Sequence, residues 1–171
     1  MSNANQAASS ALKRADRILR HPLFLEHMEQ NRKAEENRIY CHHDLPHLLD
    51  TARIMRIISL EENIEIPADL IYAAALVHDL GKHLQYDRGI PHEQAGADIA
   101  SAILEDCGFS VSEIAVVVDA VRGHRDPEIS GQAGLSALLY RADKASRSCW
   151  CCPAAPSCNW SDEKKNLHLV Y

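Results

Sequence analysis

Apolar residues recur at spacings of three and four along most of this chain, and this helical period constrains the fold more than any other feature. Val117, Val121 and His124 share one stripe of the pattern. Leu139 and Asp143 share another. Such spacing places residues on one face of an α-helix, whereas no segment shows the sustained period-2 alternation of a half-buried strand. The sequence therefore predicts an all-α fold.

Prolines and capping residues divide this pattern into separate helices. Gly81 offers a C-terminal cap, Gly96 should let another helix come close, and Ser110 with Glu113 forms a capping-box signature. We expect helices over residues 10–38 in two pieces split near Pro22, then over 46–62, 67–80, 91–107, 110–124 and 135–148.

The length of 171 residues fits one domain, and 46% hydrophobic with 25% charged residues is close to the average for soluble globular chains. A packed core is therefore feasible. We expect a single-domain helical bundle over residues 11–148, after a flexible leader at 1–10. A cysteine-rich extension, residues 149–171, should pack on the domain.

The net charge of −6 argues against nucleic-acid binding, because proteins that bind duplexes usually carry a basic field. No stretch approaches the roughly 18 apolar residues of a membrane span, and the N-terminus is polar rather than signal-like. We therefore expect a cytoplasmic protein with neither a membrane nor a nucleic acid as partner, and a homodimer stays open.

Five of the expected helices each carry a histidine or an aspartate on the apolar face: His47, the pair His78 and Asp79, His92, His124 and Asp143. If they converge, a divalent cation would compensate the cost of burying the carboxylates. A mixed nitrogen and oxygen shell suits iron, manganese, cobalt, nickel or zinc better than calcium. Six ligands exceed a four-coordinate zinc site and suit two ions with one bridging carboxylate.

Taken singly, each of these residues also has a structural explanation. A lone histidine on an apolar helix face is most often a hydrogen-bonded core residue, and a lone aspartate caps a helix or pairs with an arginine. The joint pattern favours a metal centre, because stability gives no reason to place six such groups on the inward faces of five helices.

Three segments carry a resemblance to a known family. AAALVHDLGK at 73–82 resembles the signature of the HD-domain superfamily of metal-dependent phosphohydrolases. HLLDTARIM at 47–55 resembles that family's first-histidine helix, and RADKASR at 141–147 resembles its final aspartate segment. The resemblance covers about residues 40–147, and the order of an early His, the HD pair and a late Asp is specific.

The resemblance implies a helical bundle in which one metal ion is bound by His47, His78, Asp79 and Asp143. In the binuclear branch of the family, histidines on two intervening helices bind a second ion, and His92 and His124 match those positions. Asp79 would then bridge the two ions. The chain lacks the paired histidine and the GYP motif of the cyclic-dinucleotide phosphodiesterase branch, which argues against that substrate.

Phosphohydrolase chemistry would need basic groups beside the metal ions. Lys82 matches a position that in parts of the family contacts phosphate or supports catalysis, so Asp79 and Lys82 are the expected catalytic residues. Further candidates for phosphate binding are Arg125, Arg141, Lys144 and Arg147, of which at least half should be solvated surface. The expected substrate is a nucleotide or dinucleoside polyphosphate, because the dinucleoside-tetraphosphate hydrolase branch has a similar ligand series and ADK segment.

Two other functions stay open at this stage. A few members of the superfamily with a similar six-ligand series are di-iron oxygenases that cleave carbon bonds of inositol or phosphonates. A non-catalytic metal or nucleotide sensor is the other alternative, although a pure binding module would not need two metals.

Cysteines and the remaining histidines complete the set of candidates. A second metal site for zinc or an iron–sulfur cluster would use Cys149, Cys151, Cys152 and Cys158, and free thiols are the alternative. His42, His43, Asp44 and His83 are open as pocket residues. We expect His21, His27 and His168 to lie on the surface.

Overall fold

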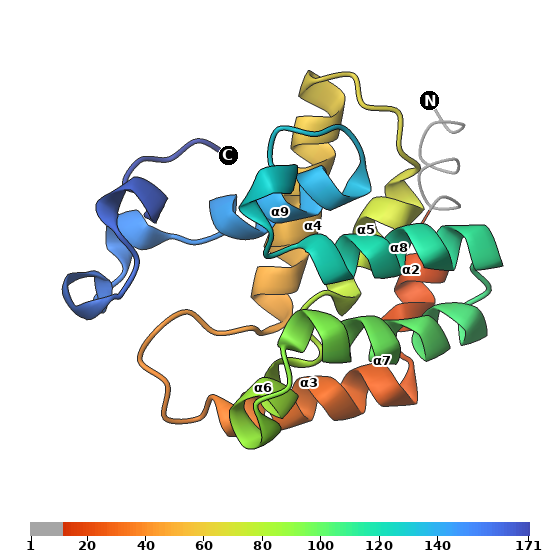
Figure 1. Cartoon of the computed structure of the whole chain (residues 1–171), viewed down its shortest axis with the longest axis horizontal. Coiled ribbons are helices and arrows are strands. Elements are labelled where there is room, and N and C mark those ends of the chain that lie inside the picture. The colour runs from red at the N-terminus through yellow and green to blue at the C-terminus, as the bar shows by residue number, and fades with distance from the viewer. Residues whose placement is uncertain (1–11) are drawn as a thin grey trace, which may run out of the picture.

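The computed structural model describes residues 12–171, and within that range the chain forms helices and turns but no strand (Figure 1). The all-α prediction is confirmed. The expected leader at 1–10 lies outside the described residues. The α-helices are α2 (Lys13–Ile18), α3 (Pro22–Ala34), α4 (Leu45–Glu61), α5 (Ala68–Val77), α6 (Lys82–Arg88), α7 (His92–Asp106), α8 (Val111–Gly123) and α9 (Leu135–Ala145). None of these helices is long and apolar enough to cross a membrane.

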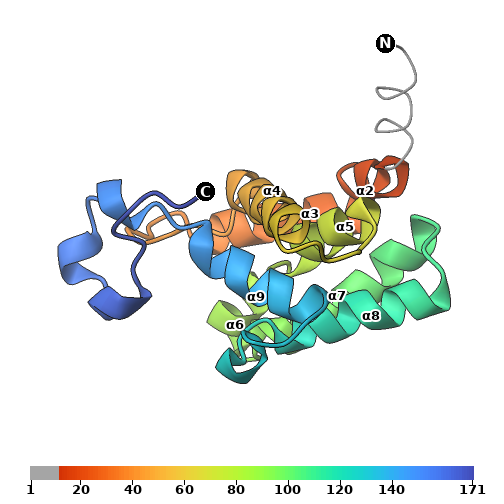
Figure 2. The ribbon, with the colours of Figure 1, turned by 90° about the horizontal axis from the view of Figure 1, so that it is seen from above.

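Helix α5 is the centre of the bundle and packs against α2, α4, α7, α8 and α9. Apart from Ala68 and Tyr72, every residue of α5 is buried, which explains why its sequence is apolar on nearly all sides. Helices α7 and α8 form an antiparallel pair joined by a short turn, in which Gly108 adopts a positive φ of 86° (Figure 2). The ends of α5, α7 and α8 therefore meet on one side of the core.

Local sequence signals fix where several helices begin. Pro22 opens α3 as expected, and Asp44 caps α4 by accepting a hydrogen bond from the backbone N–H of His47 at 3.0 Å. The capping box of Ser110 and Glu113 at the start of α8 is confirmed. The last helix is shorter than predicted, because α9 ends at Ala145 and the chain continues in short 3₁₀ turns.

Gly81 does not cap a helix in the way the sequence predicted. Its φ is −80°, outside the left-handed region, and it precedes α6, a seven-residue helix that the sequence analysis missed. A Cβ atom at Gly81 would lie 2.6 Å from the backbone nitrogen of Gly96 and 2.7 Å from the carbonyl oxygen of His92. Gly81 is therefore needed for the close approach of α7 to the turn after α5. The expected close approach at Gly96 is confirmed, because a Cβ there would lie 3.0 Å from the His78 carbonyl oxygen.

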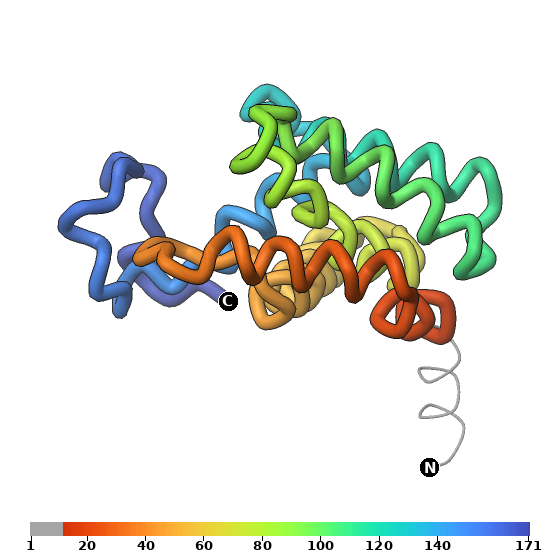
Figure 3. The backbone as a smooth tube through the Cα atoms, turned by 90° about the horizontal axis from the view of Figure 1, so that it is seen from below, coloured from red at the N-terminus to blue at the C-terminus, as the bar shows by residue number. Residues whose placement is uncertain are grey.

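The extension 149–171 lies beside the loop between α3 and α4, at one end of the molecule (Figure 3). The Tyr40 hydroxyl of that loop donates to the carbonyl oxygen of Ser157 at 3.1 Å. The side-chain amide of Asn166 donates to the carbonyl oxygens of Lys144 and Arg147, at 2.7 and 2.8 Å. These hydrogen bonds connect the extension to the α3–α4 loop and to the end of α9.

Replacement of Gly81 by alanine should separate α7 from the α5–α6 turn, because the new methyl group meets backbone atoms that cannot move alone. We expect the free energy of unfolding to fall by about 1–3 kcal/mol, as for other overpacked sites. Gly131→Ala is the matched control, since a Cβ there meets nothing within 4 Å. Chemical denaturation of both variants measures the difference, and equal stability would contradict the close-approach role.

Candidate metal centre

The six predicted ligands converge at one point in the bundle. Each comes from the end of a helix, and they are His47 in the first turn of α4, His78 and Asp79 directly after α5, His92 at the start of α7, His124 directly after α8 and Asp143 in the last turn of α9. All six side chains are buried, with His78 fully inaccessible to solvent. The structure therefore places them as the sequence pattern indicated.

The ligand atoms form two groups that share Asp79. Its Oδ2 atom lies 3.0 Å from His78 Nε2 and 3.3 Å from His47 Nε2. Its Oδ1 atom lies 3.2 Å from His92 Nε2 and 3.7 Å from His124 Nε2. Within each group all ligand atoms lie within 4.8 Å of one another: His47, His78, Asp79 and Asp143 in the first, and Asp79, His92 and His124 in the second.

Hydrogen bonds from the outer ring nitrogens orient three of the histidines. His78 Nδ1 donates to the carbonyl oxygen of Ala75 at 2.8 Å, and His124 Nδ1 donates to that of Val121 at 2.5 Å. His92 Nδ1 is 2.6 Å from the side-chain oxygen of Gln85. Because these acceptors hold a proton on Nδ1, Nε2 is the nitrogen that each ring turns toward the centre, where it can bind a metal ion.

Two features of the inner nitrogens favour a bound cation. His78 Nε2 is buried and forms no hydrogen bond. The Nε2 atoms of His92 and His124 face each other at 3.1 Å, although both carry lone pairs. A divalent cation would satisfy all three nitrogens, so the donor set fits a metal site.

The electrostatics of the centre also favour a cation. Burial would raise the pKa of Asp79, but the surrounding imidazoles outweigh burial and hold its pKa well below the usual range. The pKa of Asp143 is lowered in the same way, against burial, by His47, His78 and two neighbouring cations. Burial opposes a charge on His78, yet the two carboxylates outweigh it and raise its pKa to about 10. Positive charge is therefore stabilised where a metal ion would bind.

His43 and Glu35 form a buried pair beside the centre. His43 Nε2 lies 4.0 Å from Asp79 Oδ2, and its Nδ1 is hydrogen-bonded to Glu35. The Tyr86 hydroxyl donates to Glu35 at 2.8 Å. Burial would raise the pKa of Glu35, but the contacts with His43 and Tyr86 lower it to about 2.

Of the three loop residues left open by the sequence, His43 alone lies against the ligands. Asp44 caps α4, and His42 is exposed. The sequence analysis missed Glu35 entirely, because it lies in a polar, charged segment that shows no apolar stripe.

Asn31 on α3 was also missed, although it holds the turn that carries His78 and Asp79. Its side-chain amide donates to the Asp79 carbonyl oxygen at 2.9 Å and accepts from the His83 backbone N–H at 2.8 Å. His83 is buried and stacks on His27 with ring centroids 5.2 Å apart. The expectation that His27 lies on the surface is therefore wrong, since it is half-buried against α6.

The basic candidates line one cavity of about 790 Å³ but lie differently within it. The Lys82 side chain is partly buried, and burial lowers its pKa. Lys144 pairs with Asp143, and buried Arg147 lies 3.1 Å from His47 Nε2 and 3.3 Å from Asp143 Oδ1. Three of the expected phosphate-binding residues thus lie beside the ligands.

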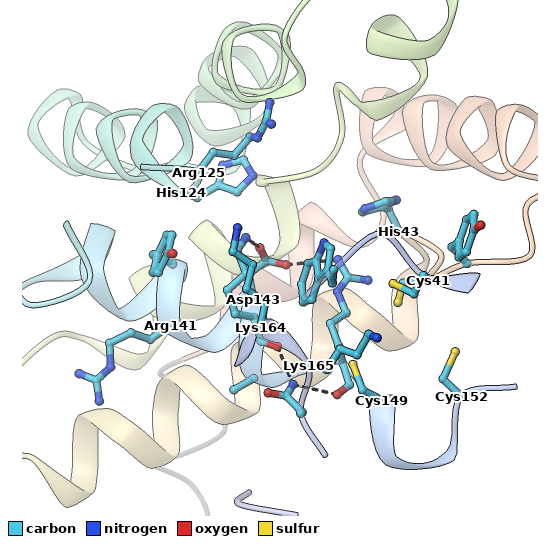
Figure 4. Close-up of a pocket in the computed structure, with 18 of the residues that line it drawn as sticks. Cys41, His43, His124, Arg125, Arg141, Asp143, Cys149, Cys152, Lys164 and Lys165 are labelled. Carbon is cyan, nitrogen blue, oxygen red and sulfur yellow. Dashed lines mark hydrogen bonds and ion pairs between the residues drawn. The ribbon is translucent and has the colours of Figure 1, made fainter. Parts of the chain in front are cut away.

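The other two basic candidates lie further out. Arg125 is exposed and pairs with Glu93 at 3.3 Å. Arg141 is bound to Glu62 and points away from Asp143 (Figure 4). Of the candidate thiols, Cys149, Cys152 and Cys158 line the same cavity, whereas Cys151 is exposed and does not.

Comparison with known proteins identifies the family. The model of the HD domain matches residues 45–148, which is more than half of the chain. The chain belongs to the HD-domain family. The predicted resemblance is thereby confirmed, and family membership with the buried histidine and aspartate cluster identifies the chain as a metal-dependent hydrolase.

The chain is also similar to two other proteins and to one solved structure. An uncharacterized protein of Clostridium beijerinckii is 40% identical over 154 residues, which cover 90% of this chain and 96% of that protein. Ribonuclease Y of Frankia casuarinae is 32% identical over 107 residues, which cover 63% of this chain but only 15% of that enzyme. The crystal structure of a "predicted HD superfamily hydrolase" from an uncultured Thermotogales bacterium has a TM-score of 0.59 at 23% identity. That alignment covers 83% of this chain and 80% of the other, and it shows a shared fold.

Replacement of Asp79 by asparagine should remove metal from both ligand groups, because the amide loses the charge that the two groups share. We expect at least a tenfold loss of bound metal at neutral pH, measured by elemental analysis after dialysis. Asp98→Asn is the control, since Asp98 is exposed on α7. Full metal content in the Asp79→Asn protein, with unchanged circular dichroism, would show that Asp79 is not a ligand.

Proposed function

We propose that this HD-domain protein hydrolyses a phosphate ester or phosphoanhydride of a small molecule, at a centre of two divalent transition-metal ions. The observation that carries the proposal is the position of Asp79, whose two oxygens face two separate ligand groups. A carboxylate shared in this way is the usual bridge in a two-metal site. Iron, manganese, cobalt, nickel and zinc all suit the mixed histidine and aspartate ligands.

The cavity beside the ligands supports a phosphorylated substrate. When bound, metal ions at such a centre polarise phosphoryl oxygens and lower the pKa of a bound water. Lys82, Lys144 and Arg147 line the same cavity and offer charged hydrogen bonds to phosphate. The volume of about 790 Å³ falls in the range of small-molecule sites. A nucleotide or a dinucleoside polyphosphate is therefore the substrate class that we propose.

Lys82 and Asp79 have distinct parts in this proposal. Lys82 is the first residue of α6, directly after the turn that carries His78 and Asp79, and its side chain lines the cavity. Its ammonium group would bind a phosphoryl oxygen as negative charge develops on that oxygen. Burial lowers its pKa, and the neighbouring carboxylates Asp79 and Asp143 partly offset this effect. Asp79 would hold the metal ions through its two carboxylate oxygens.

His43 extends the proposed machinery by one proton-transfer group. Its Nδ1 is held by Glu35, so its Nε2 faces the ligands and the cavity. Burial lowers the pKa of His43 to about 4, which leaves the imidazole neutral at pH 7. A neutral imidazole oriented by a carboxylate is a common arrangement for accepting a proton from water or returning one to a leaving group.

The test is a panel of substrates assayed with the manganese-loaded protein: a nucleoside monophosphate, a dinucleoside tetraphosphate and an RNA oligonucleotide. We expect hydrolysis of one of the two small phosphates. The RNA is included because of the ribonuclease Y relative, although the net charge of −6 disfavours a long polyanion. Cleavage of RNA alone would replace the proposed substrate class.

Lys82→Met should lower kcat by about 100-fold if Lys82 stabilises charge in the transition state. Lys13→Met is the matched control, since Lys13 lies on α2 and does not line the cavity. Equal kcat in both variants would remove Lys82 from the mechanism. If no phosphate in the panel is hydrolysed and the iron-loaded protein consumes oxygen with inositol or a phosphonate, the oxygenase alternative replaces the hydrolase.

A further inference from the structure

Four cysteines from two distant parts of the sequence line the cavity beside the metal centre. Cys41 lies in the loop before α4, and the other three lie in the C-terminal extension: Cys149, Cys152 and Cys158. All four line the cavity, and none forms a disulfide. Figure 4 shows Cys41, Cys149 and Cys152 on the same side of the pocket. The cysteine set that the sequence predicted differs at one position, because it contained exposed Cys151 in place of Cys41.

Hydrogen bonds position the two segments. The Tyr40 hydroxyl joins the loop to Ser157 of the extension, and within the loop Arg38 Nε donates to the carbonyl oxygen of Cys41 at 2.9 Å. Arg147, at the end of α9, donates to the carbonyl oxygen of His42 at 3.1 Å. The loop is therefore tied both to the end of α9 and to the extension.

The backbone of the extension presents its cysteines in turns. Cys152 N donates to the carbonyl oxygen of Cys149 at 3.3 Å, and Cys158 N donates to that of Ala155 at 3.3 Å. The spacing Cys-x2-Cys within one turn is typical of cysteines that ligate metal. Cys151 falls within the same turn, but its thiol points to the Ser148 carbonyl oxygen at 3.5 Å.

The charged residues around the thiols are compatible with a metal group that binds deprotonated cysteines. Burial raises the pKa of Cys41, Arg147 lowers it, and the thiols of Cys149, Cys152 and Cys158 raise it further. A bound metal ion would reverse this effect at Cys41, because coordination deprotonates a thiol outright. Lys165 adds positive charge near Cys149 and Cys158.

We propose that Cys41, Cys149, Cys152 and Cys158 bind an iron–sulfur cluster, each thiol losing its proton and ligating one iron. A single tetrahedral zinc ion would bring its sulfur ligands to about 3.8 Å from one another, given Zn–S bonds of about 2.3 Å. Within residues 12–171, no three of these sulfur atoms lie within 4.8 Å of one another. An iron–sulfur cluster distributes its thiolates over several irons and therefore accepts sulfur atoms that lie further apart. The proposal does not depend on the hydrolytic function.

The test measures acid-labile sulfide, iron and zinc in the full-length protein purified without oxygen. Sulfide is the decisive readout, because iron bound by the histidine and aspartate ligands brings none. We expect sulfide with the visible absorption of a cluster in the wild-type protein. Cys41→Ser and Cys152→Ser should each lose most of the sulfide, whereas Cys151→Ser, the matched control, should retain it.

Several outcomes would overturn the proposal. Wild-type protein without sulfide, or with one zinc ion in its place, would contradict the cluster even if every serine variant failed to fold. Loss of sulfide in Cys151→Ser together with its retention in Cys41→Ser would overturn the choice of ligands. Manganese binding at the histidine and aspartate centre should persist in all three variants, which separates the two sites.

Discussion

Asp79 carries a negative charge on a buried side chain, where an unpaired carboxylate would be strongly destabilising. Its two oxygens face nitrogen ligands on opposite sides, and the rest of the centre is arranged around them. The helix ends of α4, α5, α7, α8 and α9 must therefore meet at one point. The apolar length of α5 places Asp79 there, because α5 crosses the core with nearly every residue buried.

Two further constraints keep the turn after α5 in position. The backbones of Gly81 and Gly96 approach so closely that a Cβ at Gly81 would meet backbone atoms of α7 below 3.0 Å. On the opposite side, buried Asn31 binds the Asp79 carbonyl oxygen and the His83 backbone N–H. The carboxylate is thus held through its own peptide as well as through its ligands. A rigid turn of this kind limits the reorganisation needed for metal binding.

The convergence of the candidate ligands could be predicted from the sequence because each lies at the end of an apolar stripe with helical spacing. His124 after Val117 and Val121 is the clearest case. Gly81 was misinterpreted, because the sequence does not distinguish a glycine that caps a helix from a glycine that allows a neighbouring helix to approach closely. Glu35 and His43 were not assigned, since their pairing depends on the path of a loop that carries no periodic signal. Cys41 is similar: its proximity to the C-terminal thiols depends on how the extension folds back onto that loop.

The proposed bridging by Asp79 is tested most directly by electron paramagnetic resonance of the manganese-loaded protein. Two Mn²⁺ ions that share a carboxylate lie about 3.5–4 Å apart and are magnetically coupled. We expect a coupled-pair spectrum at full loading, and the spectrum of an isolated Mn²⁺ ion in a His92→Ala, His124→Ala double variant. Only isolated-ion signals from the fully loaded wild-type protein would contradict a shared carboxylate.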